Sequence, residues 1–211
     1  MLLTNWFLRA KHWQLFLLTC GLPVLFQLAM MASMIVSIGS DTNPDAEAFF
    51  NIFRLFPLMM LLFVGTFFGW FWSVAIGLQG KVPPTVKMKT GKFKFFFFTP
   101  LIYILFLLIW ISAAVTGLPG MEGGERPGAG AFGVVAIIIP MHLFSMFCMM
   151  YSLYFVAKTF KTVELQRETT FSDFAGEFFL FWFFPIGVWV VQPKINKMIA
   201  GESNTSINWG S

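Results

Sequence analysis

Charged residues are scarce in this chain. They make up 11% of its 211 residues, whereas soluble domains contain roughly 25%. Hydrophobic residues account for 57% and aromatic residues for 19%, and a soluble fold of this size has too much surface for its volume to bury them all. The composition excludes an ordinary soluble domain and predicts helices surrounded by lipid.

Signatures of catalysis are also missing. The sequence contains no P-loop, no zinc signature, no GxSxG elbow and no H-E-x-x-H, and it has two histidines and two cysteines. Cys20 and Cys148 both lie inside apolar runs, where we expect small buried hydrophobic residues rather than a disulfide or a metal pair. We therefore expect no enzyme activity, no cofactor and no resident metal.

Positive charge is present, but it is unevenly distributed. Twelve of the 14 Lys and Arg residues form four clusters at the ends of apolar runs, where they would meet lipid headgroups rather than nucleic acid. Cationic loops stay on the cytoplasmic side of a membrane, so the N-terminus is expected inside and residues 39–52 and 117–130 outside. The clusters are Arg9 and Lys11; Lys81, Lys87, Lys89, Lys92 and Lys94; Lys158, Lys161 and Arg167; and Lys194 and Lys197.

Four apolar runs are long enough to cross a membrane. A helix needs about 20 apolar residues to do so, and the runs cover about 14–38, 53–79, 95–116 and 131–157. They predict an all-α integral membrane protein with a four-transmembrane-helix bundle over residues 14–157. Pro23, which follows Gly21, predicts a kink in the first helix.

Residues 1–13 are amphipathic. Two interpretations stay open: an interfacial helix anchored by tryptophans, or the first turns of one long helix. One helical face carries Leu3, Trp6, Phe7, Ala10 and Trp13, and the other carries Asn5, Arg9 and His12.

A fifth apolar run, residues 177–192, is short. Its 16 residues would rise about 24 Å as a straight helix, which is less than the roughly 30 Å of a bilayer core. Pro185 and Gly187 divide it, so residues 177–199 are predicted to form either a broken, re-entrant hairpin or a fifth span. The hairpin would return Lys194 and Lys197 to the cytoplasmic side, but its free backbone groups would need other protein to cover them.

The segment before this run, residues 158–176, has mixed charge. Its spaced Lys, Glu and Arg residues predict a solvated cytoplasmic helix that continues from the fourth span. Thr170 and Asp173 have the spacing of a capping box, which would start a new helix. Residues 200–211 are expected to be a polar tail.

Small residues recur every four positions in the second span. Such a stripe lets helix backbones approach closely in lipid. Packing within the monomer and oligomerisation are both consistent with it. The helix-packing residues are Gly65, Gly69, Ser73 and Gly77.

Soft and ionisable side chains occur within the first and fourth spans. His142, Met146 and Met149 share the fourth, and Met30 and Met34 are one turn apart in the first. Imidazole and thioether groups suit Cu(I), and an ionisable residue within a span is a candidate ligand or polar relay. The Met30/Met34 pair and the glycine stripe distantly resemble the MxxxM and GxxxG elements of eukaryotic copper transporters. The alternative is packing.

Polar groups flank the fifth run and define a possible interface cluster. If the run doubles back, Glu177 could pair with Lys194, and the cluster could bind a partner protein or a lipid headgroup. Ordinary anchoring at the membrane interface is the alternative. The residues are Asp173, Glu177, Pro185, Gly187, Lys194 and Lys197.

Two tracts carry a resemblance to a known group of proteins. NWFLRAKHWQLFLL (5–18) and VELQRETTFSDFAGEFFLFWFFPIGVWVVQPKIN (163–196) resemble segments of uncharacterised multi-pass inner-membrane proteins of Bacteroidota-type bacteria. The resemblance implies a bacterial cytoplasmic membrane and transfers no functional residues.

The sequence favours a non-enzymatic accessory or scaffold subunit that contacts the lipid bilayer and a membrane-protein partner or a second copy of itself. The alternative is a small transporter or channel, with a metal ion as one candidate substrate, in which the broken fifth run lines the path.

Overall fold

The computed structural model describes residues 2–39, 54–115 and 129–201. Within these ranges, 87% of the residues are helical and none forms a strand, so the predicted all-α class is confirmed. The expected outer loops at 39–52 and 117–130, and the tail at 200–211, lie almost wholly outside the described residues.

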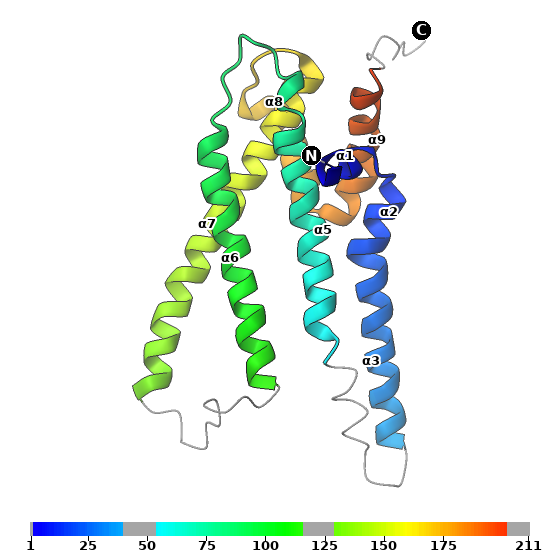
Figure 1. The fold of residues 1–211 in the computed structure, drawn as a ribbon, viewed down its shortest axis with the longest axis vertical. Helices are drawn as coiled ribbons and strands as arrows, with labels where there is room; N and C mark the ends of the chain where they lie inside the picture. Colours follow the sequence, from blue (N-terminus) through cyan, green and yellow to red (C-terminus); the bar gives the residue numbers. More distant parts are fainter. Residues whose placement is uncertain (1, 40–53, 116–128, 202–211) are drawn as a thin grey trace. The chain divides into compact units, whose positions relative to one another are not determined.

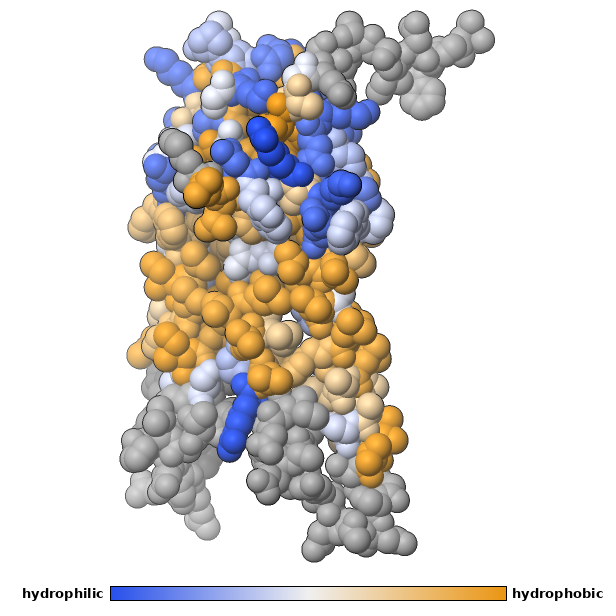
Figure 2. Space-filling model, turned by 45° about the vertical axis from the view of Figure 1, so that its right-hand side comes forward, coloured by the Kyte–Doolittle hydropathy of each residue, from blue (hydrophilic) through white to orange (hydrophobic). Residues whose placement is uncertain are grey.

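Four helices in the described ranges are long and apolar enough to cross a membrane: His12–Val36, Phe56–Lys81, Thr90–Trp110 and Ala136–Leu165. They correspond to the four predicted runs, and the fold is an all-α membrane helical bundle. The first of these spans takes in more than one helix, and its longest part lies in α3 (Leu22–Gly39). The other three lie largely in α5 (Phe56–Gly77), α6 (Thr90–Val115) and α7 (Ala129–Leu165), labelled in Figure 1. On the face drawn in Figure 2, hydrophobic residues cover a broad zone and most hydrophilic residues gather above it.

The N-terminal segment begins with a separate helix, so it is not the first turns of one long helix; its place at the membrane interface stays a prediction. Helix α1 (Leu2–Arg9) ends before α2 (His12–Phe16) begins. A π-helical turn, Leu17–Gly21, then joins α2 to α3. Pro23 has no N–H to donate to the carbonyl four residues earlier, which explains why the helix widens just before it. The kink predicted at Pro23 stays a prediction, and the irregularity that the structure shows is this turn just before it.

The segment 158–176 follows expectation in part. As predicted, α7 continues from the fourth span, as far as Leu165, and α8 (Phe171–Trp182) begins after a short loop. The end of α7 is mostly buried rather than solvated. The predicted cap is confirmed: Thr170 precedes α8 and its backbone N–H donates to Asp173 Oδ2 over 2.8 Å.

The break in the fifth run lies earlier than predicted. It falls at Phe183, between α8 and α9 (Phe184–Ala200), rather than at Pro185 and Gly187. Pro185 is the second residue of α9, where a missing N–H leaves no helical bond unmade. We call α8 and α9 together the hairpin.

The chain divides into two compact units. The first is formed by residues 1–19, 66–88 and 153–211. It contains α1, α2, the second part of α5, the end of α7, and the hairpin; α9 packs against α1, α2 and α8. In Figure 1, α1 lies crosswise between α5 and α9. The core is aromatic: Trp70 lies 5.1 Å from Phe181 and 5.1 Å from Phe184 between ring centroids, and Phe71 and Phe160 are fully buried.

The second unit is formed by residues 20–65 and 89–152. In it, α6 packs against the first part of α7 through aromatic contacts. Phe96 lies 4.5 Å from Tyr151 and 6.0 Å from Phe147 between ring centroids. Such pairs contribute about 0.5–1.5 kcal/mol beyond their buried area.

Candidate functional site

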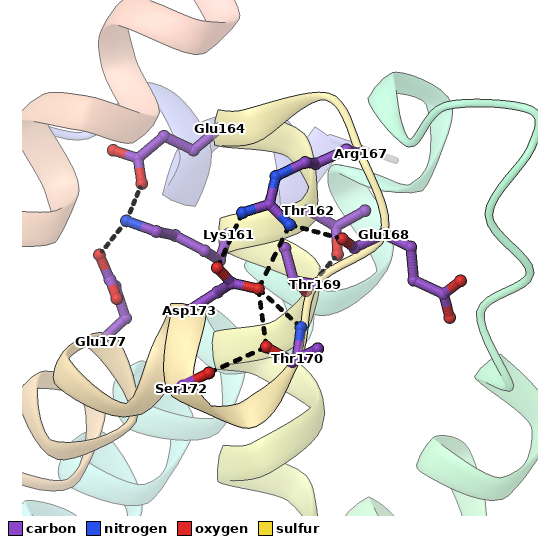
Figure 3. Close-up of polar contacts among 10 residues, drawn as sticks. All are labelled: Lys161, Thr162, Glu164, Arg167, Glu168, Thr169, Thr170, Ser172, Asp173 and Glu177. Carbon is purple, nitrogen blue, oxygen red and sulfur yellow. Dashed lines mark hydrogen bonds and ion pairs between the residues drawn. The ribbon is translucent and has the colours of Figure 1, made fainter.

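An ionic cluster joins α7, α8 and α9 in the first unit. It consists of Lys161, Glu164, Glu177 and Lys194. Lys161 Nζ lies 2.7 Å from Glu164 Oε2 and 2.8 Å from Glu177 Oε1, as Figure 3 shows. Lys194 Nζ lies 3.1 Å from Glu164 Oε1 and 3.9 Å from Glu177 Oε1. The expected Glu177–Lys194 contact is therefore present, and Glu164 is a closer partner of Lys194.

Three members of the cluster are largely shielded from solvent, contrary to the solvated face expected for this part of α7. Both glutamate side chains are 11% exposed and Lys161 is 18% exposed, whereas Lys194 is 43% exposed. The formal charges of the two lysines and two glutamates sum to zero, and a protein interior tolerates charged side chains when they pair with opposite charges. The cluster ties Lys194 to the end of α7, so the hairpin returns the chain to the α7–α8 connection.

A second polar network holds the start of α8. Arg167 Nη2 donates to Asp173 Oδ1 over 2.8 Å, and the Thr170 hydroxyl donates to Asp173 Oδ2 over 2.9 Å (Figure 3). The Arg167 guanidinium, together with the bonds from Thr170, lowers the pKa of Asp173 from its ordinary 3.8 to about 2. Asp173 bonds to Arg167 and Thr170, whereas Glu177 and Lys194 belong to the ionic cluster. The residues that the sequence analysis placed in one interface cluster therefore belong to two separate networks.

Gln192 connects α9 to both α1 and α5. Its side chain is fully buried. Trp70 Nε1 donates to Gln192 Oε1 over 2.7 Å, and Gln192 Nε2 lies 2.9 Å from the Ala10 carbonyl oxygen and 3.0 Å from that of Phe7. An amide NH₂ has two hydrogens, so these two carbonyls are its best acceptors. We call this set of contacts the Gln192 clamp.

The Gln192 clamp explains why α1 can end where it does. The last carbonyls of a helix have no partner within the helix, and a buried carbonyl without a partner is costly. Gln192 supplies that partner where the chain turns between Arg9 and His12. Lys11 N–H then donates to Gln14 Oε1 over 2.9 Å and starts α2.

Helix α1 packs against the small-residue stripe of α5. A Cβ added at Gly69 would lie 2.5 Å from Phe7 Cε2, and one at Gly77 would lie 2.7 Å from Leu8 Cδ1. Ser73, between them, donates its hydroxyl to the Gly69 carbonyl over 2.7 Å. A Cβ at Gly65 would meet nothing within 4 Å. At Gly69 and Gly77 the stripe therefore serves packing within the chain.

The turn of the hairpin satisfies its own backbone groups. Phe183 N–H donates to the Phe179 carbonyl over 2.8 Å, and Gly187 N–H donates to the Phe183 carbonyl over 2.9 Å. At Gly187 an added Cβ would overlap the Leu180 carbonyl oxygen and lie 2.6 Å from its carbonyl carbon. Gly187 thus allows α9 to approach the backbone of α8. Lys197 is exposed near the end of α9.

His142 lies in the second unit with a polar partner that the sequence did not reveal. Its Nδ1 is 3.4 Å from the Tyr103 hydroxyl oxygen on α6. Met146 and Met149 follow it on α7; Met146 is exposed and Met149 half-buried. Met30 and Met34 lie on α3, one half-buried and one exposed. In the described ranges, no three His, Cys, Asp or Glu side chains gather as metal ligands would.

The residues that sequence reasoning underestimated are Gln192 and Trp70. A single amide at the end of a short apolar run, in the tract WVVQP, was the available signal. The sequence could not single out Trp70, because it is one of eight tryptophans in an apolar chain and no local pattern indicates which of them makes a hydrogen bond.

Comparisons with protein-family models, curated proteins and solved structures find no match to this chain. Its class is therefore defined by the fold: an all-α membrane protein with four long apolar helices and a C-terminal helical hairpin tied to the end of α7.

Proposed function

We propose that this protein is a non-enzymatic accessory or scaffold subunit of a bacterial cytoplasmic membrane, which presents its hairpin to a partner. The partner is another membrane protein or a second copy of the chain. The multi-pass arrangement with a cytoplasmic N-terminus is part of the proposal, and the four cationic clusters support it. The resemblance of residues 5–18 and 163–196 to bacterial inner-membrane proteins supports the membrane assigned.

One observation carries the scaffold proposal: the main polar groups of the hairpin bond to the protein itself, whereas part of its aromatic surface is exposed. Phe181 and Phe184 are buried in the core, but other large side chains of the hairpin are not. Glu177, Lys194 and Gln192 are all engaged within the first unit. Phe179 is 56% exposed and Phe183 is 58% exposed. Held rigidly by the ionic cluster and the Gln192 clamp, these aromatic side chains form a preorganised contact surface, the kind that binds with little entropic cost.

Site-specific photo-crosslinking in native membranes tests this proposal. A photoreactive phenylalanine analogue replaces Phe179 or Phe183, and the matched control replaces Phe147, which is 59% exposed on α7. We expect a protein adduct of one defined mass from both hairpin positions, and lipid adducts from the control. An adduct of twice the chain's mass would identify a homo-oligomer. Lipid adducts alone at all three positions would refute the proposal.

A small transporter or channel is the second hypothesis, with the break between α8 and α9 as its motivation. Broken helices in transporters offer free backbone groups to a solute. Here the Phe183 and Gly187 N–H groups bond to carbonyls within the turn, which supports the scaffold proposal over this one. Liposomes containing the purified protein would show ion or metal flux if the transporter hypothesis were correct.

A further inference from the structure

In the second unit, α6 and α7 line a cavity of about 630 Å³. This volume is within the range of small-molecule sites, about 300–1,000 Å³. Seven lining residues are apolar, among them Phe106, Trp110 and Phe144. The other three carry hydroxyl groups, and they are Thr99, Tyr103 and Ser145.

The three hydroxyls differ in whether they already have a partner. Thr99 donates to the Phe95 carbonyl over 2.9 Å, and the Tyr103 hydroxyl oxygen is 3.4 Å from His142 Nδ1. Ser145 is 7% exposed, and its side chain makes no hydrogen bond to any residue the structure describes. In the described part of the chain, no fully buried side-chain oxygen lacks a partner. The Ser145 hydroxyl is therefore open to the cavity that it lines, where it is available to a molecule that enters.

The depth of these hydroxyls restricts what that molecule can be. Tyr103 lies halfway along α6, which runs from Thr90 to Val115. At 1.5 Å per residue it is roughly 18–20 Å from either end of the helix. Water is absent at that depth in a bilayer, and the ester groups of a phospholipid remain near the interface. A ligand that reaches Ser145 must be lipid-soluble and must carry its polar group into the apolar zone.

We infer that this cavity binds a lipid-soluble carbonyl compound of the quinone type. The Ser145 hydroxyl donates to a ring carbonyl, and the neighbouring Tyr103 hydroxyl lies at the same cavity as a second polar contact. The aromatic side chains Phe106, Trp110 and Phe144 provide surfaces on which a planar ring packs favourably. This ligand site goes beyond the scaffold role proposed above and does not depend on it.

Tryptophan fluorescence of the full chain in quinone-free nanodiscs tests the inference. The probe is 2-decyl-1,4-benzoquinone, and decylbenzene serves as a competitor with the same chain but no carbonyl. We expect saturable quenching in the wild type, loss of the saturable part in Trp110→Phe, and weak competition by decylbenzene. Non-saturable quenching alone, in protein that melts like the wild type before the titration, would overturn the inference.

Two serine variants test the polar contact. Ser145→Ala should weaken quinone binding about 5- to 10-fold, the usual contribution of one neutral hydrogen bond. Ser152→Ala is the matched control, because Ser152 is buried on the same helix and its hydroxyl bonds to the Cys148 carbonyl over 2.9 Å. The affinity of the Ser152→Ala variant for the quinone should equal that of the wild type. Equal affinities for all three proteins, or equally strong binding of decylbenzene, would show that the cavity recognises no carbonyl.

Discussion

Replacing Gln192 by Met, a side chain of similar length, should destabilise the first unit. The substitution leaves two buried groups without a hydrogen-bond partner: the Trp70 indole N–H and the Phe7 carbonyl. The Ala10 carbonyl also loses Gln192 but keeps Asn196 Nδ2 as a donor, 3.3 Å away. Each unpartnered group costs at least about 1 kcal/mol, so the loss is about 2 kcal/mol. For a chain of this size, that corresponds to a melting temperature lower by roughly 4–8 °C.

The assay is thermal unfolding in mild detergent at one fixed heating rate, because unfolding of such proteins is often irreversible. Gln79→Met is the matched control: Gln79 is half-buried, and its amide donates to the Ala75 carbonyl of the preceding helical turn over 2.6 Å. That variant should lose less than about 1 kcal/mol.

A double-mutant cycle isolates the contact between Gln192 and Trp70. Trp70→Phe keeps an aromatic ring and removes the N–H. If the two side chains are coupled as the 2.7 Å hydrogen bond indicates, the effects of Trp70→Phe and Gln192→Met should be non-additive by about 0.5–3 kcal/mol. Additive effects, or equal losses in Gln192→Met and Gln79→Met, would refute the role assigned to the Gln192 clamp.

Three further predictions use the same melting assay. Gly187→Ala should destabilise the protein strongly, because its Cβ overlaps a backbone carbonyl of α8; a wild-type melting temperature would contradict the tight approach of the two helices. Gly69→Ile should displace α1 and lower stability, whereas Gly65→Ile, where a Cβ meets nothing within 4 Å, should change stability little; equal effects would argue against packing of α1 on the stripe. Ionised Asp173 stabilises the fold because its pKa is lowered from 3.8 to about 2. Its contribution is therefore complete above about pH 4 and lost as the pH falls towards 2. The melting difference between wild type and Asp173→Asn should disappear over that interval, and a difference unchanged down to pH 2 would contradict the Arg167 pairing.

Local sequence signals predicted the features that depend on nearby residues. The four apolar helices follow from composition and run length, since about 20 apolar residues suffice to cross a bilayer. The cap at Thr170 and Asp173 spans three positions, so its spacing was visible in the sequence. The small-residue stripe indicated a close helix approach, but it did not identify α1 as the element that packs there.

The candidate site depends on contacts between distant residues. Gln192 bonds to the Ala10 carbonyl across 182 positions and to Trp70 across 122, and no local pattern encodes either pairing.

The sequence by itself determined that four segments are apolar and long enough to cross a membrane, because hydrophobicity and charge are properties of each residue. The tertiary structure decided that α1 is a separate helix and that the fifth run folds back as a hairpin. Both outcomes depend on pairs of polar groups that meet only when the chain is folded. Gln192 bonds to the carbonyls at the end of α1, and Lys194 lies 3.1 Å from Glu164 at the end of α7.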